Sequence, residues 1–213
     1  MNTRRRFGGG ATGNAQKGGT GGAVIDLFDV LARDHELVRA LLRELEAGPP
    51  AGAGRRRLLP ARKRQVDRLI TEESGHEAVE GQYFWPEVRR VVPDGSDLAD
   101  RGMAQERVAR FLLDELLAFQ PGEAAHEEML AGFLNTAREH LKYEEHQVWP
   151  ALRPRLSREE AADLGARIIR AKTWAPTRPH PRSSMRPALL RATAPLVGAT
   201  DRFRDAVSGR HRH

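Results

Sequence analysis

HEAVEGQYFWP, at residues 76–86, returns as HLKYEEHQVWP at residues 140–150, an offset of 64 positions. Each copy contains a histidine, a glutamate four residues later, and a Trp-Pro pair that begins five residues after the glutamate. Residues four apart lie on the same face of an α-helix, so each copy is predicted to place an imidazole and a carboxylate side by side. A second match, of residues 41–45 with residues 112–116, has an offset of 71 and indicates that the chain contains two similar helical hairpins.

Apolar side chains recur at three- and four-residue steps through four long segments around these repeats. We expect these helices at about residues 23–48, 56–92, 96–119 and 123–152. Ser96 is the expected N-cap of the third helix, and Pro86 is expected to kink or loosen the last turn of the second. A capping box, Ser157 to Glu160, predicts a short fifth helix that ends near Ala171. Long amphipathic helices joined by short turns favour antiparallel neighbours, so the sequence predicts an all-α, up-down-up-down four-helix bundle.

Composition divides the 213-residue chain into four segments. Residues 1–22 contain eight glycines and no acidic residue, and residues 173–213 are rich in proline and arginine, so we expect both termini to be disordered. Between them we expect a four-helix domain at residues 23–155 and a capping helix at residues 156–172. The net charge is +4 in the first segment, +6 in the last and −4 between them, so the basic character belongs to the tails.

The composition also excludes several classes of protein. There is no cysteine, which removes disulfides, thiolate catalysis, zinc fingers and cysteine-bound iron–sulfur clusters, and which suits a cytoplasmic protein. No run of about 18 apolar residues is present, so no membrane-spanning helix and no membrane partner are expected. No DNA-reading motif accompanies the positive charge, so the basic tails are expected to make only nonspecific contact with nucleic acid.

Histidines and glutamates on the inward faces of the helices form a candidate metal site. The set comprises His35, His76, Glu80, Glu106, His140 and Glu144. Glu106 enters because the hairpin offset of 71, applied to His35, reaches this glutamate and not another histidine. Buried imidazoles and carboxylates are costly without a compensating cation, and together they suit iron, manganese or zinc. Six such side chains could hold two metals with carboxylate bridges.

The same residues also allow interpretations other than a site for two metals. A single inward histidine such as His35 is more often a hydrogen-bonded core residue. Glu106 could point outward, in which case one metal position would be lost, and a mononuclear zinc site would need only part of the set. Glu73 shares the inward face of the second helix and could support the site from outside or neutralise Arg39 or Arg110. The repeat of the His-x-x-x-Glu pair on two helices favours a metal site over these alternatives.

At these residues the chain resembles the hemerythrin-like HHE cation-binding family. The matching elements are Asp34-His35 on the first helix and the two repeated stretches with their Trp-Pro pairs, so the resemblance covers roughly residues 23–155. The segment from Leu164 to Pro181 is similar to the tail of actinobacterial members. The resemblance implies a hemerythrin-like bundle that holds a non-haem di-iron centre and binds dioxygen or related small molecules.

The third helix departs from the family pattern, which usually supplies a histidine where this chain has Glu106. A carboxylate in place of an imidazole adds negative charge and favours the ferric state, as in oxidising carboxylate di-iron proteins. Oxygen-carrying members have a second histidine one turn further on, where this chain has Arg110. Reversible oxygen transport is therefore not expected.

Two hypotheses from different classes follow. The first is a cytoplasmic di-iron protein that binds dioxygen or peroxide and serves oxygen or redox sensing, iron handling or peroxide defence, with manganese or zinc as alternative metals. The second is a non-enzymatic helical interaction module with a vestigial site, whose basic tails bind nucleic acid or an acidic partner. The sequence identifies neither a turnover reaction nor an oligomeric state.

Other conspicuous side chains receive structural roles. Trp85 and Trp149 are expected to pack at the end of the bundle, where each following proline turns the chain. Tyr143 could hydrogen-bond a small molecule at the centre, but an aromatic residue at helical spacing is more often part of the core. His126 and His146 fall off the inward face and are expected at the surface.

Overall fold

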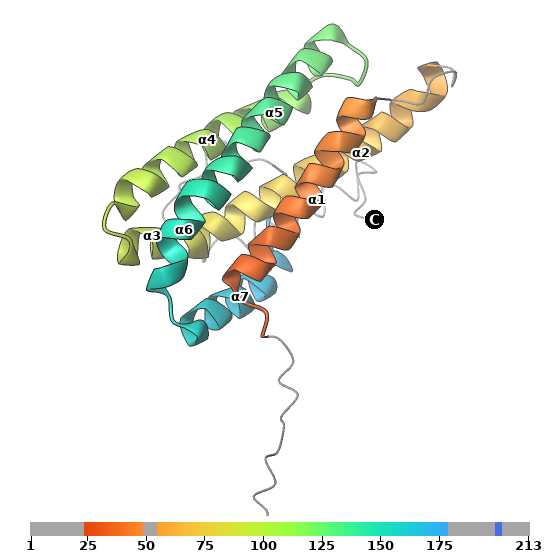
Figure 1. Ribbon diagram of the computed structural model, residues 1–213. Coiled ribbons are helices and arrows are strands. Elements are labelled where there is room, and N and C mark those ends of the chain that lie inside the picture. The colour runs from red at the N-terminus through yellow and green to blue at the C-terminus, as the bar shows by residue number, and fades with distance from the viewer. Residues whose placement is uncertain (1–23, 49–54, 179–198, 202–213) are drawn as a thin grey trace, which may run out of the picture.

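The computed structural model describes residues 24–48, 55–178 and 199–201, with side chains described from residue 59 onward in the second helix. The expected disorder of residues 1–22 lies outside these ranges, as does most of the basic tail. Within them the chain is built of helices and short connections and contains no strand (Figure 1). The elements are α1 (Leu27–Ala47), α2 (Arg55–Val79), η1 (Glu80–Phe84), α3 (Trp85–Val91), α4 (Gly95–Leu116), α5 (Ala124–Tyr143), η2 (Glu144–Val148), α6 (Trp149–Leu152), η3 (Arg153–Arg155) and α7 (Arg158–Lys172).

Four helical stretches pack as an up-down-up-down bundle, which confirms the predicted fold class. The first and third stretches are the single helices α1 and α4, whereas the second and fourth each contain two α-helices joined through η1 or η2. α4 lies beside α5, and α1 lies beside α2 (Figure 1). The short fifth helix, α7, lies near the start of α1 and packs against α1 and α2. None of the described helices is long and apolar enough to cross a membrane.

Side-chain caps and one close backbone contact fix where the helices begin. Ser157 forms the predicted capping box with Glu160 at the start of α7. The prediction that Ser96 caps the third helix is wrong, because α4 already begins at Gly95. A Cβ atom at Gly95 would lie 2.1 Å from the carbonyl oxygen of Val88, so only glycine allows α4 to start this close to α3.

The second and fourth stretches each contain a five-residue π-helix, η1 or η2, which the sequence did not predict. Each π-helix begins at the glutamate of the repeat, Glu80 or Glu144, and ends where the amide of Trp85 or Trp149 donates to that glutamate's carbonyl oxygen. The proline that follows each tryptophan has no N–H, and its ring would clash with a carbonyl in a regular α-helix. The wider π turn accommodates the proline, so each repeat contains a bulge at this point.

A polar layer crosses the bundle between two apolar clusters. One cluster lies toward α7 and includes Leu31, Val79, Val88 and Val148. The other lies toward the opposite end and includes Val38, Leu69, Leu113 and Phe133. Along α1, His35 falls between Leu31 and Val38, and each of the other bundle helices carries a histidine or glutamate at the same level. The bundle therefore shields this layer from water at both ends.

Candidate metal centre

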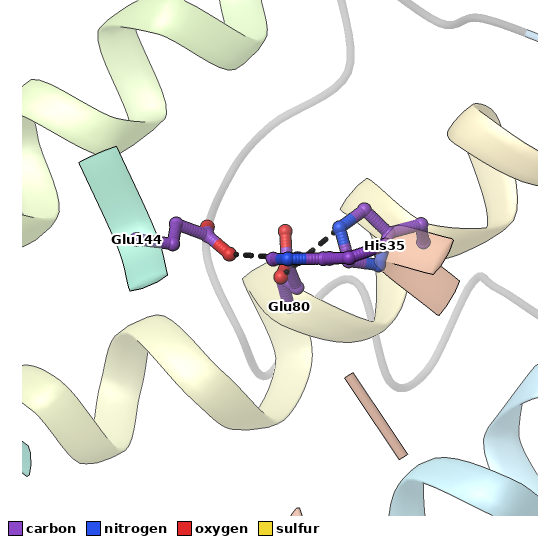
Figure 2. Close-up of side chains that lie close together, drawn as sticks. His35, Glu80 and Glu144 are labelled. Carbon is purple, nitrogen blue, oxygen red and sulfur yellow. Dashed lines mark ion pairs between the residues drawn. The ribbon is translucent and has the colours of Figure 1, made fainter. Parts of the chain in front are cut away.

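The structure brings all six predicted residues together in the polar layer. They come from all four helical stretches, and none is more than 4% exposed: His35, His76, Glu80, Glu106, His140 and Glu144. Figure 2 shows the side chains of His35, Glu80 and Glu144 converging from α1, η1 and η2. The inward periodicity of four separate helices thus places six potential ligands at one level of the bundle.

The six residues form two groups that share two glutamates. One group consists of His35, His76, Glu80 and Glu144, and we call it the first metal position. The other consists of Glu80, Glu106, His140 and Glu144, and we call it the second metal position. Within each group one potential ligand atom per residue lies within 4.8 Å of the others. Two neighbouring cations could therefore be bound with Glu80 and Glu144 between them.

Each shared carboxylate presents one oxygen to each position. Glu144 Oε2 lies 3.2 Å from His35 Nε2, and Glu144 Oε1 lies 3.3 Å from His140 Nε2. Glu80 Oε1 lies 3.3 Å from His76 Nε2, and Glu80 Oε2 lies 4.0 Å from His140 Nε2. This division of oxygens is the arrangement that a carboxylate bridging two metals requires.

The atoms that face the two positions have no hydrogen-bond partner among the described residues. These atoms are Nε2 of His35, His76 and His140 and both carboxylate oxygens of Glu80 and Glu144. Buried polar atoms in folded proteins almost always form hydrogen bonds, because leaving them unpaired costs free energy. Nitrogen and oxygen donors of this kind suit iron, manganese and zinc, so the donor set fits a pair of such metals.

Glu106 points into the centre, so the alternative in which it faces solvent is wrong. Its Oε1 accepts a hydrogen bond from the indole N–H of Trp85, and its Oε2 accepts one of 3.4 Å from Arg110. Ligation of a metal by Glu106 stays a prediction. The two donors nevertheless fix the carboxylate beside the second metal position.

The outer nitrogens of two histidines are held by residues that the sequence did not indicate. His35 Nδ1 lies 2.7 Å from Glu145 Oε1, and the other oxygen of Glu145 accepts a hydrogen bond of 2.5 Å from Arg39. His140 Nδ1 lies 3.1 Å from the amide oxygen of Gln105. Such contacts orient a metal-ligating imidazole and select the tautomer that turns Nε2 toward the metal. Burial lowers the pKa of His35 to about 4, although Glu145 acts in the opposite direction.

The charges within the cluster shift other pKa values strongly. Burial alone would lower the pKa of His76, but the carboxylates of Glu80 and Asp34 outweigh it and raise the pKa to about 9. Burial and the negative charge of Glu80 raise the pKa of Glu106 to about 7. Burial, together with Glu80 and Glu106, raises the pKa of Glu144 well above its ordinary value. Metals that bind here must therefore displace protons.

Both tryptophans of the repeat pack in the apolar cluster toward α7, as expected for the end of the bundle, and both also contact the polar cluster. Trp85 donates to Glu106, and Trp149 stacks on the ring of His35 with 4.9 Å between ring centroids. Tyr143 behaves as a core residue, since its hydroxyl donates a hydrogen bond of 2.9 Å to the Leu98 carbonyl.

Among the histidines that the structure describes, His126 is the one whose predicted location is wrong. It was expected at the surface but is 1% exposed, with Nδ1 3.3 Å from Glu127, whereas His146 is exposed as predicted. The helical period places His126 off the inward face of its own helix, yet its side chain is buried in the folded structure. The apolar residues at helical spacing therefore do not identify every buried residue of a helix.

Glu73 is buried near the site and neutralises neither of the arginines proposed for it. Arg39 pairs with Glu145, and Arg110 pairs with Glu106 and with Glu77, a buried glutamate that the sequence analysis missed. Glu73 therefore adds a buried carboxyl group, whose pKa burial raises, beside His76.

Comparisons with known proteins agree with this geometry. A model of the hemerythrin HHE cation binding domain matches residues 26–171. An uncharacterized hemerythrin-like protein of Schizosaccharomyces pombe is 20% identical over 145 residues, which are 68% of this chain and 71% of the yeast protein. A crystal structure of a hemerythrin HHE cation binding domain-containing protein from Mycobacterium kansasii, a homologue of Rv2633c, is similar with a TM-score of 0.58 and 21% identity. That similarity covers 79% of this chain and 99% of the mycobacterial one.

Proposed function

The chain belongs to the hemerythrin HHE cation-binding family, and from this premise we propose that it is a non-haem di-iron protein that binds dioxygen or peroxide. The proposed ligands are His35, His76, Glu80, Glu106, His140 and Glu144. The proposed roles are oxygen or redox sensing, iron handling or peroxide defence. Bound iron would supply the one-electron redox chemistry, and the protein would supply binding, orientation and exclusion of water.

The division of the Glu80 and Glu144 oxygens between two positions is the observation that carries the dinuclear part of this proposal. A single zinc site would require only one of the two groups and would leave the other buried, unpaired donors without a role. Two cations would pair with the unpartnered atoms of both groups at once. A dinuclear centre therefore accounts for the whole buried cluster.

The surroundings of Glu106 favour redox chemistry over reversible oxygen transport. A third carboxylate at the centre adds negative charge and stabilises the ferric state. Arg110 stands where oxygen carriers have a second histidine on this helix, and its guanidinium donates to Glu106. Trp85 holds the other oxygen of the same carboxylate. These contacts hold the Glu106 carboxylate beside the second metal position, and the charge of Arg110 offsets part of its negative charge.

Metal analysis by plasma mass spectrometry tests the proposal. Protein from iron-supplemented medium should contain about two irons per chain, as expected for a carboxylate-bridged pair, and should absorb in the near ultraviolet. His76→Ala should lose metal, whereas His146→Ala, which changes an exposed histidine, should keep it. One colourless zinc per chain would instead support a mononuclear site, and two manganese ions would change the metal but keep the centre. No metal after anaerobic ferrous reconstitution would overturn the proposal and direct attention to the basic tails as an interaction module.

A further inference from the structure

The segment after the bundle reaches back to the metal centre. Lys172 is the last residue of α7, and its ammonium group pairs with the carboxylate of Asp34 on α1. The other oxygen of Asp34, Oδ2, lies 3.5 Å from Nδ1 of His76. Lys172, Asp34 and His76 thus form a chain of charged contacts from α7 to a proposed ligand of the first metal position.

The residues after Lys172 approach His76 from a second direction. Ala175 is fully buried, and a Cβ atom built on Gly75 would lie 3.7 Å from Ala175 Cβ and 3.8 Å from the Pro176 carbonyl oxygen. Gly75 directly precedes His76, so this segment lies against the same turn of α2. We call residues 172–177 the C-terminal clasp.

The two histidines of the first metal position have similar supports, but from different parts of the fold. His35 contacts Glu145, which pairs with Arg39, and all three residues belong to the four-helix bundle. His76 contacts Asp34, and Asp34 pairs with Lys172, which belongs to α7 outside the bundle. The histidine of the second position contacts the neutral amide of Gln105 instead. Only the first position therefore has a support that reaches into the C-terminal clasp.

We propose that Lys172 is a positioning residue of the metal centre, and that the C-terminal clasp sets how long the first metal position retains its ion. A carboxylate behind a metal-ligating imidazole orients the ring and increases its basicity. Lys172 holds the Asp34 carboxylate near His76, and without this cation the half-buried aspartate can rotate toward water. Lys172 lies immediately after the region that matches the family model, residues 26–171. The inference rests on the proposed dinuclear site.

Metal release from full-length protein tests the inference. Protein reconstituted with two ferrous ions is mixed anaerobically with excess chromogenic ferrous chelator, and the release of each ion is followed by absorbance. Lys172→Met should release one of the two ions about tenfold faster and leave the other unchanged, in line with the usual effect of losing a residue behind a ligand. Lys172→Arg should restore slow release because it keeps the cation.

Two further variants make the test specific. Arg167→Met removes a cation from the exposed face of α7, where Arg167 pairs with Asp163, and should release both ions as the wild type does. Gln105→Leu should accelerate the other ion, the one held by His140. Unchanged release from Lys172→Met would overturn this inference but not the dinuclear site, and equal acceleration of both ions would also overturn it by indicating general loosening. Wild-type protein that takes up no iron would overturn both proposals.

Discussion

His76 and His35 face the same proposed metal position but carry different charges in the absence of metal. The pKa of His76 is raised to about 9, because Glu80 and Asp34 outweigh the effect of burial, and the pKa of His35 is lowered to about 4 by burial. Near pH 7.5 one imidazole therefore holds a proton on a nitrogen that a metal needs. Ligation requires the neutral ring, so metal and proton compete for His76.

Metal affinity should consequently rise with pH between about 6 and 9. Below the raised pKa of His76 the binding ion must expel a proton, which costs a factor of about ten in affinity per pH unit for each proton expelled. Glu106, with a pKa of about 7, adds to the effect at the acidic end of this range. Competition with a chromophoric chelator at several pH values measures the slope, and an indicator dye in weak buffer counts the released protons. An affinity independent of pH would contradict this assignment of charge.

Gly102 is a position where the structure leaves no room for a side chain. A Cβ atom at Gly102 would lie 2.2 Å from the ring of Trp85, the tryptophan that donates to Glu106. Gly102→Ala should therefore displace a fully buried ring and destabilise the protein by about 1–3 kcal/mol, as overpacking does. Urea unfolding measures the loss.

Gly132→Ala is the matched control for this substitution. The added methyl group would lie 3.8 Å from Leu112, which is ordinary contact, and alanine is the better helix former by about 1 kcal/mol. This variant should keep or gain stability. Equal stability of the two variants would show that Trp85 moves aside without cost.

At the level of elements, η1 and η2 place the two shared glutamates. A π-helix adds one residue to a turn, and one residue corresponds to about 100° of rotation in an α-helix. The proline after each π-helix makes the return to a regular α-helix unfavourable at that point. The Trp-Pro pairs therefore help to set the direction in which Glu80 and Glu144 point.

Pro86→Ala should weaken metal retention without loss of helix. Alanine restores an N–H and removes the clash, so η1 can relax to a regular α-helix and rotate Glu80 relative to the residues after it. We expect release of bound metal to become about tenfold faster, with an unchanged circular dichroism spectrum. Pro60→Ala changes a proline of α2 that is remote from the centre and should leave release unchanged. Equal release rates in all three proteins would show that Pro86 does not hold the π turn in place.

The elements also show how far the sequence could predict the site. The inward stripe of each helix identified His35, His76, His140 and their glutamate partners, because burial in a bundle follows the helical period. Gln105 was not identifiable, since its approach to His140 depends on how α4 docks against α5. The π turns leave no mark in hydropathy, although the repeated Trp-Pro pair is the signal that could have indicated them.

At the scale of the whole molecule, the proposed metal centre places imidazole and carboxylate groups in the middle of the apolar core, where their burial is unfavourable. Apolar clusters lie on both sides of the polar layer and bury the site residues. The buried imidazole nitrogens and carboxylate oxygens that lack a hydrogen-bond partner are a cost that folding must bear in the absence of a cation. Metal binding and folding should therefore be coupled.

Removal of the metal should lower stability. A ligand present at a hundred times its dissociation constant stabilises the native state by about 2.7 kcal/mol. The thermal unfolding midpoint of the reconstituted protein should thus exceed that of chelator-treated protein, and calorimetry on the two samples measures the difference. His76→Ala should show a smaller difference, because one proposed ligand is missing. Identical midpoints for wild-type protein with and without metal would contradict the coupling.

The separation of the site residues along the chain has a consequence for synthesis. His35 contacts Glu145, 110 positions later, and the first metal position takes ligands from both hairpins of the repeat. During translation the N-terminal hairpin is synthesised before η2. At that stage it lacks Glu144, which belongs to both metal positions. Contacts between such distant residues form late in folding, since the intervening loop must close first. The proposed metal pair could therefore bind only after the second hairpin has docked, so a filled centre would mark a chain that has been synthesised and folded at least through η2.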